Sequence, residues 1–207
     1  MKVSNNHIID FYFDFMSPFS YLAHLRLPNL ARQFECKLDY HPIDLPAAKL
    51  AAGNTGPPNV KIPIKLQYLT SDLDRWAARY GAPIKFPPSL DSRMVNCGTF
   101  FADKRSQTED YVQKTWRRIW GNGEDMSDLA VLSQIAGDMG WRPDEFLDFV
   151  CSDNVLKQYD QSNANAQQVG VFGAPTMILD GQMWWGNDRL DFLRDFLKNK
   201  QNRGFEK

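Results

Sequence analysis

The chain has 207 residues, and its 24 Lys and Arg residues nearly balance its 25 Asp and Glu residues, which leaves a formal net charge of −1. This balance gives no electrostatic reason to expect a nucleic acid or an anionic membrane as a partner. No apolar run reaches the roughly 18–20 residues that a membrane-crossing helix needs, and the polar stretch 1–7 lacks the apolar core of a signal peptide. We therefore expect a cytoplasmic protein, built as one large domain or as a domain with an insertion.

The cysteines and histidines follow no site pattern. Cys36, Cys97 and Cys151 are far apart and form no close pair, which argues against a disulfide framework, a zinc site and a Cys-x-x-Cys redox centre. The three histidines also lack metal-ligand spacing, so we expect no metal site.

The segment 8–34 reads as a buried strand that stops at the start of a helix. β-Branched and aromatic residues alternate from Ile8 to Phe15, which favours a strand. Pro18 suits the first turn of a helix, and Ser17 before it is a natural N-cap. Apolar residues at helical spacing between 22 and 34 predict one long helix. Ser17 then lies at a strand-to-helix corner where N–H groups stabilise an anion, although this stretch alone favours a simple cap.

The middle of the chain changes from strand to loop to helices. Alternation over 37–43 predicts a second strand and hence a βαβ unit. Residues 49–63 are rich in Gly, Pro and Asn, so they read as a loop, either a linker or a ligand-contacting segment that offers Lys49, Asn54 and Asn59. Residues from about 64 to 165 look all-helical, with Ser127 as a cap and with stops at Gly81, Gly121 and Gly140.

The C-terminal part returns to strands. Residues 176–179 and 182–185 predict a hairpin with Asp180-Gly181 as its two-residue turn, followed by a last helix. A βαβ unit, about a hundred helical residues and a ββα unit together predict an α/β protein, a thioredoxin-like fold with an inserted all-α domain. The expected thioredoxin-like domain is discontinuous, 1–48 and 166–207, and the expected inserted helical domain with a substrate loop is 49–165.

Two further stretches could complete a site at the corner. Ala174-Pro175 stands at a strand entry between Gly173 and Thr176, where thioredoxin-like folds carry a cis-proline. Ala174 would then offer its N–H and C=O to an extended peptide. Asn187 and Asp188 open the last helix, either as caps or as a holder for an amino-acid head group, with its carboxylate at the helix N-terminus and its ammonium on Asp188.

Three segments, 13–22, 173–176 and 185–190, resemble the motifs of the 2-hydroxychromene-2-carboxylate isomerases, a family in the kappa-class glutathione transferase and DsbA-like branch of the thioredoxin superfamily. The resemblance covers nearly the whole chain. DsbA-type oxidases carry two cysteines at the corner, where this chain has Ser17 and Ser20. The resemblance therefore implies that the thiol comes from a ligand, which in this family is glutathione.

The resemblance also implies roles for single residues. Ser17 would be catalytic, since its hydroxyl would stabilise the glutathione thiolate. The expected cofactor-binding residues are Ser17, Asn54, Ala174, Trp185, Gly186, Asn187 and Asp188. The expected substrate-binding residues are Lys49, Asn59 and Val60. Related isomerases have a basic residue after the position of Asn59, whereas this chain has Val60 and then Lys61.

The function implied is the glutathione-dependent cis–trans isomerisation of 2-hydroxychromene-2-carboxylate to trans-o-hydroxybenzylidenepyruvate in bacterial catabolism of naphthalene and polycyclic aromatics, by a homodimer. One alternative is a kappa-class glutathione transferase or peroxidase, which would consume glutathione. Another is a non-catalytic thioredoxin-fold protein that only binds a peptide. A periplasmic disulfide enzyme fits least, because the corner has no cysteine.

Overall fold

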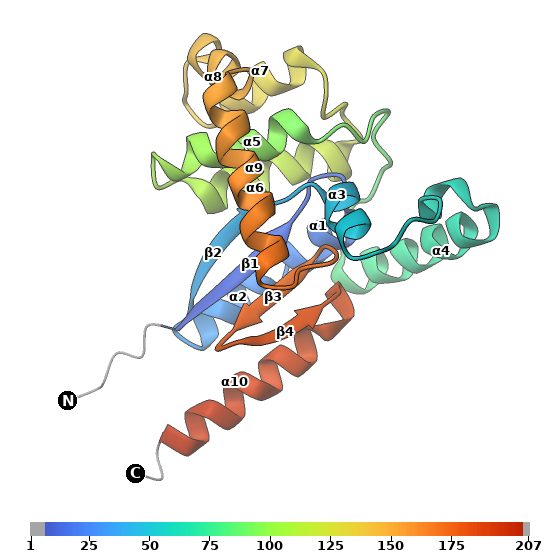
Figure 1. Ribbon diagram of the computed structural model, residues 1–207, viewed down its shortest axis with the longest axis vertical. Helices are drawn as coiled ribbons and strands as arrows, with labels where there is room; N and C mark the ends of the chain where they lie inside the picture. Colours follow the sequence, from blue (N-terminus) through green and yellow to red (C-terminus); the bar gives the residue numbers. More distant parts are fainter. Residues whose placement is uncertain (1–6, 205–207) are drawn as a thin grey trace.

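The computed structural model describes residues 7–204, and its centre is a four-stranded sheet of order β2-β1-β3-β4 (Figure 1). The strands are β1 (Ile8–Phe13), β2 (Lys37–Pro42), β3 (Thr176–Leu179) and β4 (Gln182–Trp185). β1 pairs with β2 in parallel and with β3 in antiparallel, and β3 pairs with β4 in antiparallel. The predicted α/β thioredoxin-like arrangement, a βαβ unit joined to a ββα unit, is confirmed.

Two helices rather than one connect β1 to β2. α1 (Pro18–His24) ends before α2 (Leu27–Gln33) begins, so the single long helix predicted from the apolar spacing is wrong. Pro28 explains the break, because inside a continuous helix it would lack an N–H donor and its ring would clash with the carbonyl of His24. Pro28 is instead accepted in the first turn of α2.

The loop that was predicted to start at Lys49 starts after Ala51, because Lys49 belongs to a helix. α3 (Leu45–Ala51) begins after Asp44, whose side chain accepts a hydrogen bond from the Ala47 N–H at 2.9 Å. An irregular stretch follows, then a 3₁₀ turn, η1 (Asn59–Lys61), and the long helix α4 (Pro63–Tyr80). Figure 1 shows η1 and most of α4 projecting from the rest of the chain as an arm. Gly81 ends α4 in the left-handed conformation (φ 64°), as predicted.

The remaining helices are α5 (Arg93–Asp103), α6 (Thr108–Trp116), α7 (Leu129–Asp138), α8 (Pro143–Val150), α9 (Asp153–Gln168) and α10 (Leu190–Gly204). The helix end predicted at Gly121 is wrong. After α6 the chain continues as a π-helical turn, η2 (Arg117–Asn122), and this helical segment ends at Gly123. Ser127 is not the cap of α7: its hydroxyl donates to Asp125, and Asp128 caps instead.

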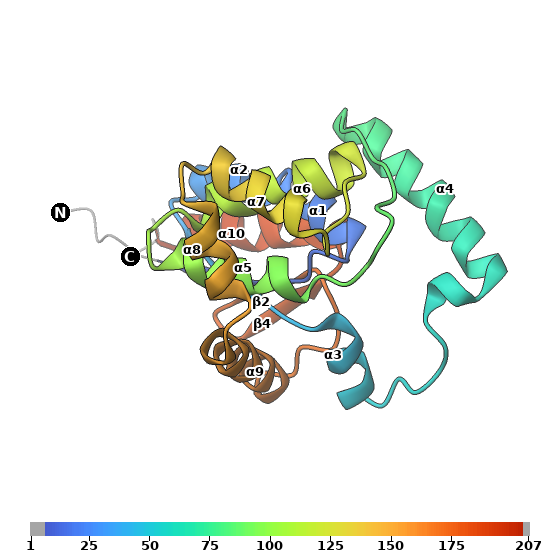
Figure 2. The ribbon, with the colours of Figure 1, turned by 90° about the horizontal axis from the view of Figure 1, so that it is seen from above.

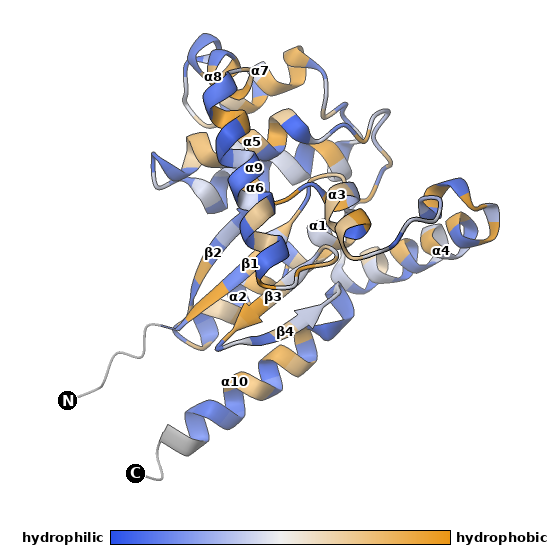
Figure 3. Cartoon of the chain, in the orientation of Figure 1, coloured by the Kyte–Doolittle hydropathy of each residue, from blue (hydrophilic) through white to orange (hydrophobic). Residues whose placement is uncertain are grey.

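Helices cover both faces of the sheet. Figure 2 shows α3 and α9 on one side and α1, α2 and α10 on the other. Successive β1 side chains accordingly alternate: Phe11 and Phe13 join the main core, and Tyr12 joins a smaller cluster that includes Ala166 of α9. Hydrophobic residues run along β1 and β3, whereas the visible face of α9 is mostly hydrophilic (Figure 3).

The main core is continuous between the sheet and the helical segment. Phe13 and Phe15 pack on Trp116 of α6 with ring centroids 5.2 and 4.9 Å apart. The division into domains at 49 and 165 stays a prediction. Over residues 7–204, no helix combines the length and apolar character needed to cross a membrane.

Candidate active site

Ser17 lies buried at the corner between β1 and α1. It is the N-cap of α1, and its Oγ accepts a hydrogen bond from the Ser20 N–H at 3.2 Å. The same hydroxyl donates to the Ala174 carbonyl at 3.4 Å, which joins two motifs 157 residues apart. At this length the second hydrogen bond is weak. The hydroxyl is therefore placed beside a strand entry but is free to turn to another acceptor.

The Ala174-Pro175 bond, a candidate for cis because of its place in a thioredoxin-like fold, is cis. The Pro175 carbonyl accepts from the Gly186 N–H at 2.9 Å, so the second and third motifs also meet. The N–H of Ala174 makes no hydrogen bond within the described part of the chain. An extended peptide beside Ala174 would thus find a free backbone donor next to the Ser17 hydroxyl.

A glycine and two aromatic rings form the wall beside this entry. A Cβ on Gly173 would lie 2.5 Å from Nε1 of Trp185, so only glycine lets the indole approach this closely. Trp185 is half exposed and packs edge-on against Phe172, with centroids 4.9 Å apart. The two rings give the site an apolar, solvent-accessible side.

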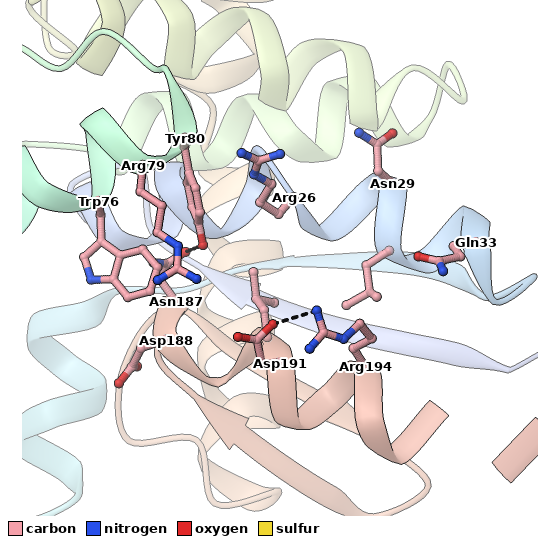
Figure 4. A pocket seen from close by; sticks show the side chains of 12 residues that line it. Arg26, Asn29, Gln33, Trp76, Arg79, Tyr80, Asn187, Asp188, Asp191 and Arg194 are labelled. Carbon is pink, nitrogen blue, oxygen red and sulfur yellow. Dashed lines mark hydrogen bonds and ion pairs between the residues drawn. The ribbon is translucent and has the colours of Figure 1, made fainter. Parts of the chain in front are cut away.

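Asn187 and Asp188 differ in burial. Asn187 is 3% exposed, and its Oδ1 accepts from the Tyr80 hydroxyl at 3.2 Å, while its buried Nδ2 has no partner among residues 7–204. Asp188 is half exposed and pairs with Arg189 at 2.5 Å. Both line a cavity of about 410 Å³ between α2, the end of α4 and the start of α10 (Figure 4).

Asp14 stabilises the corner that holds Ser17, and the sequence analysis did not identify this role. Its buried carboxylate accepts from the N–H groups of Met16 (3.0 Å) and Leu45 (2.9 Å), from the Ser92 hydroxyl and from the Asn96 amide (2.9 Å). Burial raises the pKa of Asp14, and these hydrogen bonds act to lower it. The only signal in the sequence was an acidic residue inside an apolar run. Asp14 ties the turn before Ser17 to the start of α3.

Phe15 is fixed on both of its backbone groups. Trp120, on the π-helical turn η2, donates from its indole N–H to the Phe15 carbonyl at 2.7 Å. Asn96 accepts from the Phe15 N–H at 3.2 Å. The approach to Ser17 is thus held by side chains from 81 and 105 residues away, which no local pattern reveals.

Lys49 lies on the last turn of α3 and is partly buried. Burial lowers its pKa, and the Asp14 carboxylate acts to raise it. Its ammonium makes no ion pair or hydrogen bond in the described ranges. Asn54, Asn59 and Val60 follow on the exposed chain that leads to α4; no hydrogen bond links their side chains to Ser17 among residues 7–204.

The structure thus brings together one part of the expected site and not the other. Hydrogen bonds connect Ser17 to Ala174 and Gly186 to Pro175. Trp185 precedes Gly186 in the chain, and Asn187 and Asp188 follow it. No hydrogen bond among residues 7–204 joins the side chains of Lys49, Asn54, Asn59 or Val60 to this group. Cys36, Cys97 and Cys151 are free thiols, and the buried Ser20 hydroxyl has no partner within the described part of the chain.

Known proteins give a consistent comparison. A family model for the DsbA-like thioredoxin domain matches residues 8–198. A 2-hydroxychromene-2-carboxylate isomerase of Sphingobium xenophagum is 47% identical over 189 residues, which cover 91% of this chain and 97% of that protein. A glutathione S-transferase kappa 2 of Caenorhabditis elegans is 26% identical and covers 93% of this chain and 92% of its own length.

Solved structures agree with the sequences. The structure of a 2-hydroxychromene-2-carboxylate isomerase superposes with a TM-score of 0.92 and 39% identity, over 96% of this chain and 98% of the other. A cytosolic disulfide reductase, DsbM of Pseudomonas aeruginosa, determined with GSH, superposes with a TM-score of 0.66 and 15% identity, over 94% of this chain and 99% of the other. The latter likeness concerns the fold alone.

Proposed function

Because the chain belongs to the DsbA-like thioredoxin family and, within it, to the 2-hydroxychromene-2-carboxylate isomerases, we propose that it isomerises 2-hydroxychromene-2-carboxylate to trans-o-hydroxybenzylidenepyruvate with glutathione as cofactor. The observation that carries this proposal is the Ser17 hydroxyl 3.4 Å from the Ala174 carbonyl, at a corner with no cysteine. That arrangement suits a thiol brought by a ligand.

The residues present fit a thiol tripeptide. A loosely bonded hydroxyl faces the place of the sulfur, a free Ala174 N–H faces its backbone, and the Asn187 amide lacks a partner. A free thiol of pKa about 8.5 is only a few per cent ionised near pH 7, and lowering that pKa by about two units takes about 2.7 kcal/mol. The Ser17 hydroxyl, helped by N–H groups in the first turn of α1, supplies a stabilisation of this size.

When bound, glutathione would supply a thiolate for reversible addition to the conjugated substrate, so that the ring C–O bond of the hemiketal could open to a phenol and a ketone and the former double bond could rotate before the thiolate left unchanged. The chain's own residues orient and stabilise. Ser17 holds a proton toward the sulfur, and Ala174 fixes the cysteinyl backbone. Trp185 and Phe172 offer the site an apolar wall. Trp185, Gly186, Asn187 and Asp188 hold the γ-glutamyl end.

For the substrate carboxylate we assign Lys49, the partly buried cation nearest in sequence to the expected loop, with Asn59 and Val60 as neighbours and Asn54 toward glutathione. Lys49→Met should raise KM for the hydroxychromene carboxylate about tenfold or more, since a charge-assisted hydrogen bond contributes about 1.5–3 kcal/mol. Glutathione affinity should stay the same. Lys61→Met, on the exposed η1 turn, is the matched control. If KM for the Lys49→Met variant equalled that of wild type, Lys49 would not bind the substrate carboxylate.

The direct test is an ultraviolet absorbance assay of hydroxychromene carboxylate turnover with and without glutathione. We expect turnover only with glutathione and a constant thiol concentration. Loss of thiol would instead favour the kappa-class transferase or peroxidase alternative, to which the Caenorhabditis relative lends distant support. Binding of glutathione without turnover of any electrophile would favour the non-catalytic alternative.

We further propose a homodimer in the cytoplasm. Exposed apolar side chains gather along the arm formed by η1 and α4, namely Val60, Ile64 and Tyr68; a second copy of the chain could cover them. Free thiols and a reduced thiol cofactor suit a reducing compartment. Light scattering that gave a monomer mass at working concentration would contradict the dimer.

A further inference from the structure

The cavity next to Asn187 and Asp188 has features beyond those that the proposed reaction has used so far. Its volume of about 410 Å³ is in the range of small-molecule sites. Figure 4 shows its lining side chains coming from α2, from the C-terminal end of α4 and from the start of α10. Asn187 and Asp188 of the third motif are among its lining residues, so the cavity shares these two residues with the expected glutathione site.

Two arginines in the cavity lack counter-charges. Arg26 stacks over the Tyr80 ring with its Cζ 4.6 Å from the centroid, and Arg79 lies over Trp76 at 5.3 Å. Neither guanidinium makes an ion pair or a hydrogen bond with any residue of the described chain. A stacked guanidinium is held in plane while its N–H edges stay available, which is the arrangement that binds a carboxylate in two-point fashion.

The other charges around the cavity are already paired. Arg194 pairs with Asp191 at 3.0 Å, and Asp188 pairs with Arg189 at 2.5 Å. The charge that remains uncompensated in the cavity is therefore positive. An anionic group is the ligand that it would attract.

The two arginines act at one point. Burial raises the pKa of the Tyr80 hydroxyl, whereas its hydrogen bond to Asn187 and the charges of Arg26 and Arg79 act to lower it. Asp191, which is paired with Arg194, acts to raise it, so both guanidiniums and this paired carboxylate lie within electrostatic reach of the Tyr80 oxygen. The same hydroxyl donates to Asn187. Only 3% of Asn187 is exposed, and its amide nitrogen has no hydrogen-bond partner among residues 7–204. Cations and an unused donor thus surround the end of the third motif.

We propose that Arg26 and Arg79 bind the α-carboxylate of the γ-glutamyl group of glutathione. The inference rests on the proposed function. The Gly186 N–H bonds to the Pro175 carbonyl at 2.9 Å, which places the third motif beside Ala174. With its cysteinyl group along Ala174, the tripeptide would extend its γ-glutamyl group toward Asn187 and Asp188, which line the cavity. Asp188 takes the ammonium group, and the arginines take the carboxylate. Specificity for a γ-glutamyl thiol over a shorter thiol then comes from this cation pair.

The test compares two thiols on wild type and on the variants Arg26→Gln, Arg79→Gln and Arg75→Gln. Arg75 is the matched control, because it lies on the same helix, α4, and faces Asp72 at 3.8 Å outside the cavity. The thiols are glutathione and cysteinylglycine, which lacks the γ-glutamyl group. Dissociation constants come from calorimetry, and KM for the hydroxychromene carboxylate is measured with saturating thiol.

We expect Arg26→Gln and Arg79→Gln each to weaken glutathione binding about tenfold or more, with cysteinylglycine binding, substrate KM and melting temperature unchanged. Arg75→Gln should match wild type. Unchanged glutathione affinity, or an equal loss for both thiols, would overturn the inference. A rise in substrate KM alone would also overturn it, since the pair would then serve the substrate carboxylate. A wild type that binds no glutathione would refute the proposed function itself, a result distinct from a failure in the variants only.

Discussion

Ser17→Ala removes the hydroxyl that we assign to thiolate stabilisation. In the structure that hydroxyl donates to Ala174 over 3.4 Å, so little is lost when it turns to a sulfur. A hydrogen bond to an ionised acceptor contributes about 1.5–3 kcal/mol, which corresponds to about 1–2 units in the pKa of the bound thiol. If the bound thiol of the wild type titrates near 6.5, its ionised fraction near pH 7 should fall from roughly three quarters to roughly 3–25%.

The assay is a titration of glutathione bound to each protein, followed by the ultraviolet absorbance of the thiolate, alongside the pH profile of kcat. Both midpoints should move to higher pH by the same amount in the variant. A merely structural role predicts lower stability with unmoved midpoints. Unmoved midpoints together with full turnover would refute the assignment and leave Ser17 as a helix cap.

The matched control is Ser152→Ala. Ser152 caps α9 by accepting from the Val155 N–H at 3.3 Å, much as Ser17 caps α1. Loss of either cap should cost about 0.5–2 kcal/mol of stability. Only the Ser17 variant should change thiol ionisation, so the pair separates the cost of a lost cap from the loss of a catalytic donor.

Two further changes test the packing around the site. Gly173→Ala places a Cβ 2.5 Å from the Trp185 indole nitrogen, so it should lower the free energy of unfolding by about 1–3 kcal/mol and weaken glutathione binding. The control is Gly137→Ala in α7, whose Cβ meets nothing within 4 Å and should raise the free energy of unfolding by about 0.5–1 kcal/mol. Equal melting temperatures of the two variants would contradict this prediction. Burial lowers the pKa of His24 to about 3, so the unfolded chain takes up a proton near pH 6.5 that the folded chain refuses. The free energy of unfolding should therefore fall by up to about 1.4 kcal/mol for each pH unit as the pH is lowered from about 6.5 to about 3. In urea unfolding, the stability of His24→Phe should depend less steeply on pH over this range than that of wild type.

Local signals made part of the fold and site predictable. The cap at Ser17 and the hairpin turn at Asp180-Gly181 each depend on a few neighbouring residues with strong conformational preferences. The cis bond before Pro175 was a candidate only because of its place in the fold. Features that depend on distant contacts were missed. Trp120 and Asn96 fix Phe15 from 105 and 81 residues away, and no periodicity reports such a pairing.

The helix boundaries show the same limit on a smaller scale. The apolar spacing across α1 and α2 is continuous, because both helices bury apolar residues in the same main core. Pro28 was the available signal for the break, and the period of the apolar residues concealed it. The start of α3 was missed because Asp44 reads as part of a turn, whereas its carboxylate is a helix cap.

Asp14 explains how the two halves of the proposed site stay in register. One carboxylate oxygen holds the Met16 N–H beside Ser17, and the other holds the Leu45 N–H at the start of the helix that carries Lys49. A single buried carboxyl group thus positions both the thiol-activating hydroxyl and the carboxylate-binding cation. Burial raises the pKa of Asp14, and its hydrogen bonds, among them the one from Asn96, act to lower it; negative charge on Asp14 in turn acts to raise the pKa of Lys49. An aliphatic residue at this position could fill the space but could bind neither backbone, so the requirement for a buried acid follows from the geometry of the site.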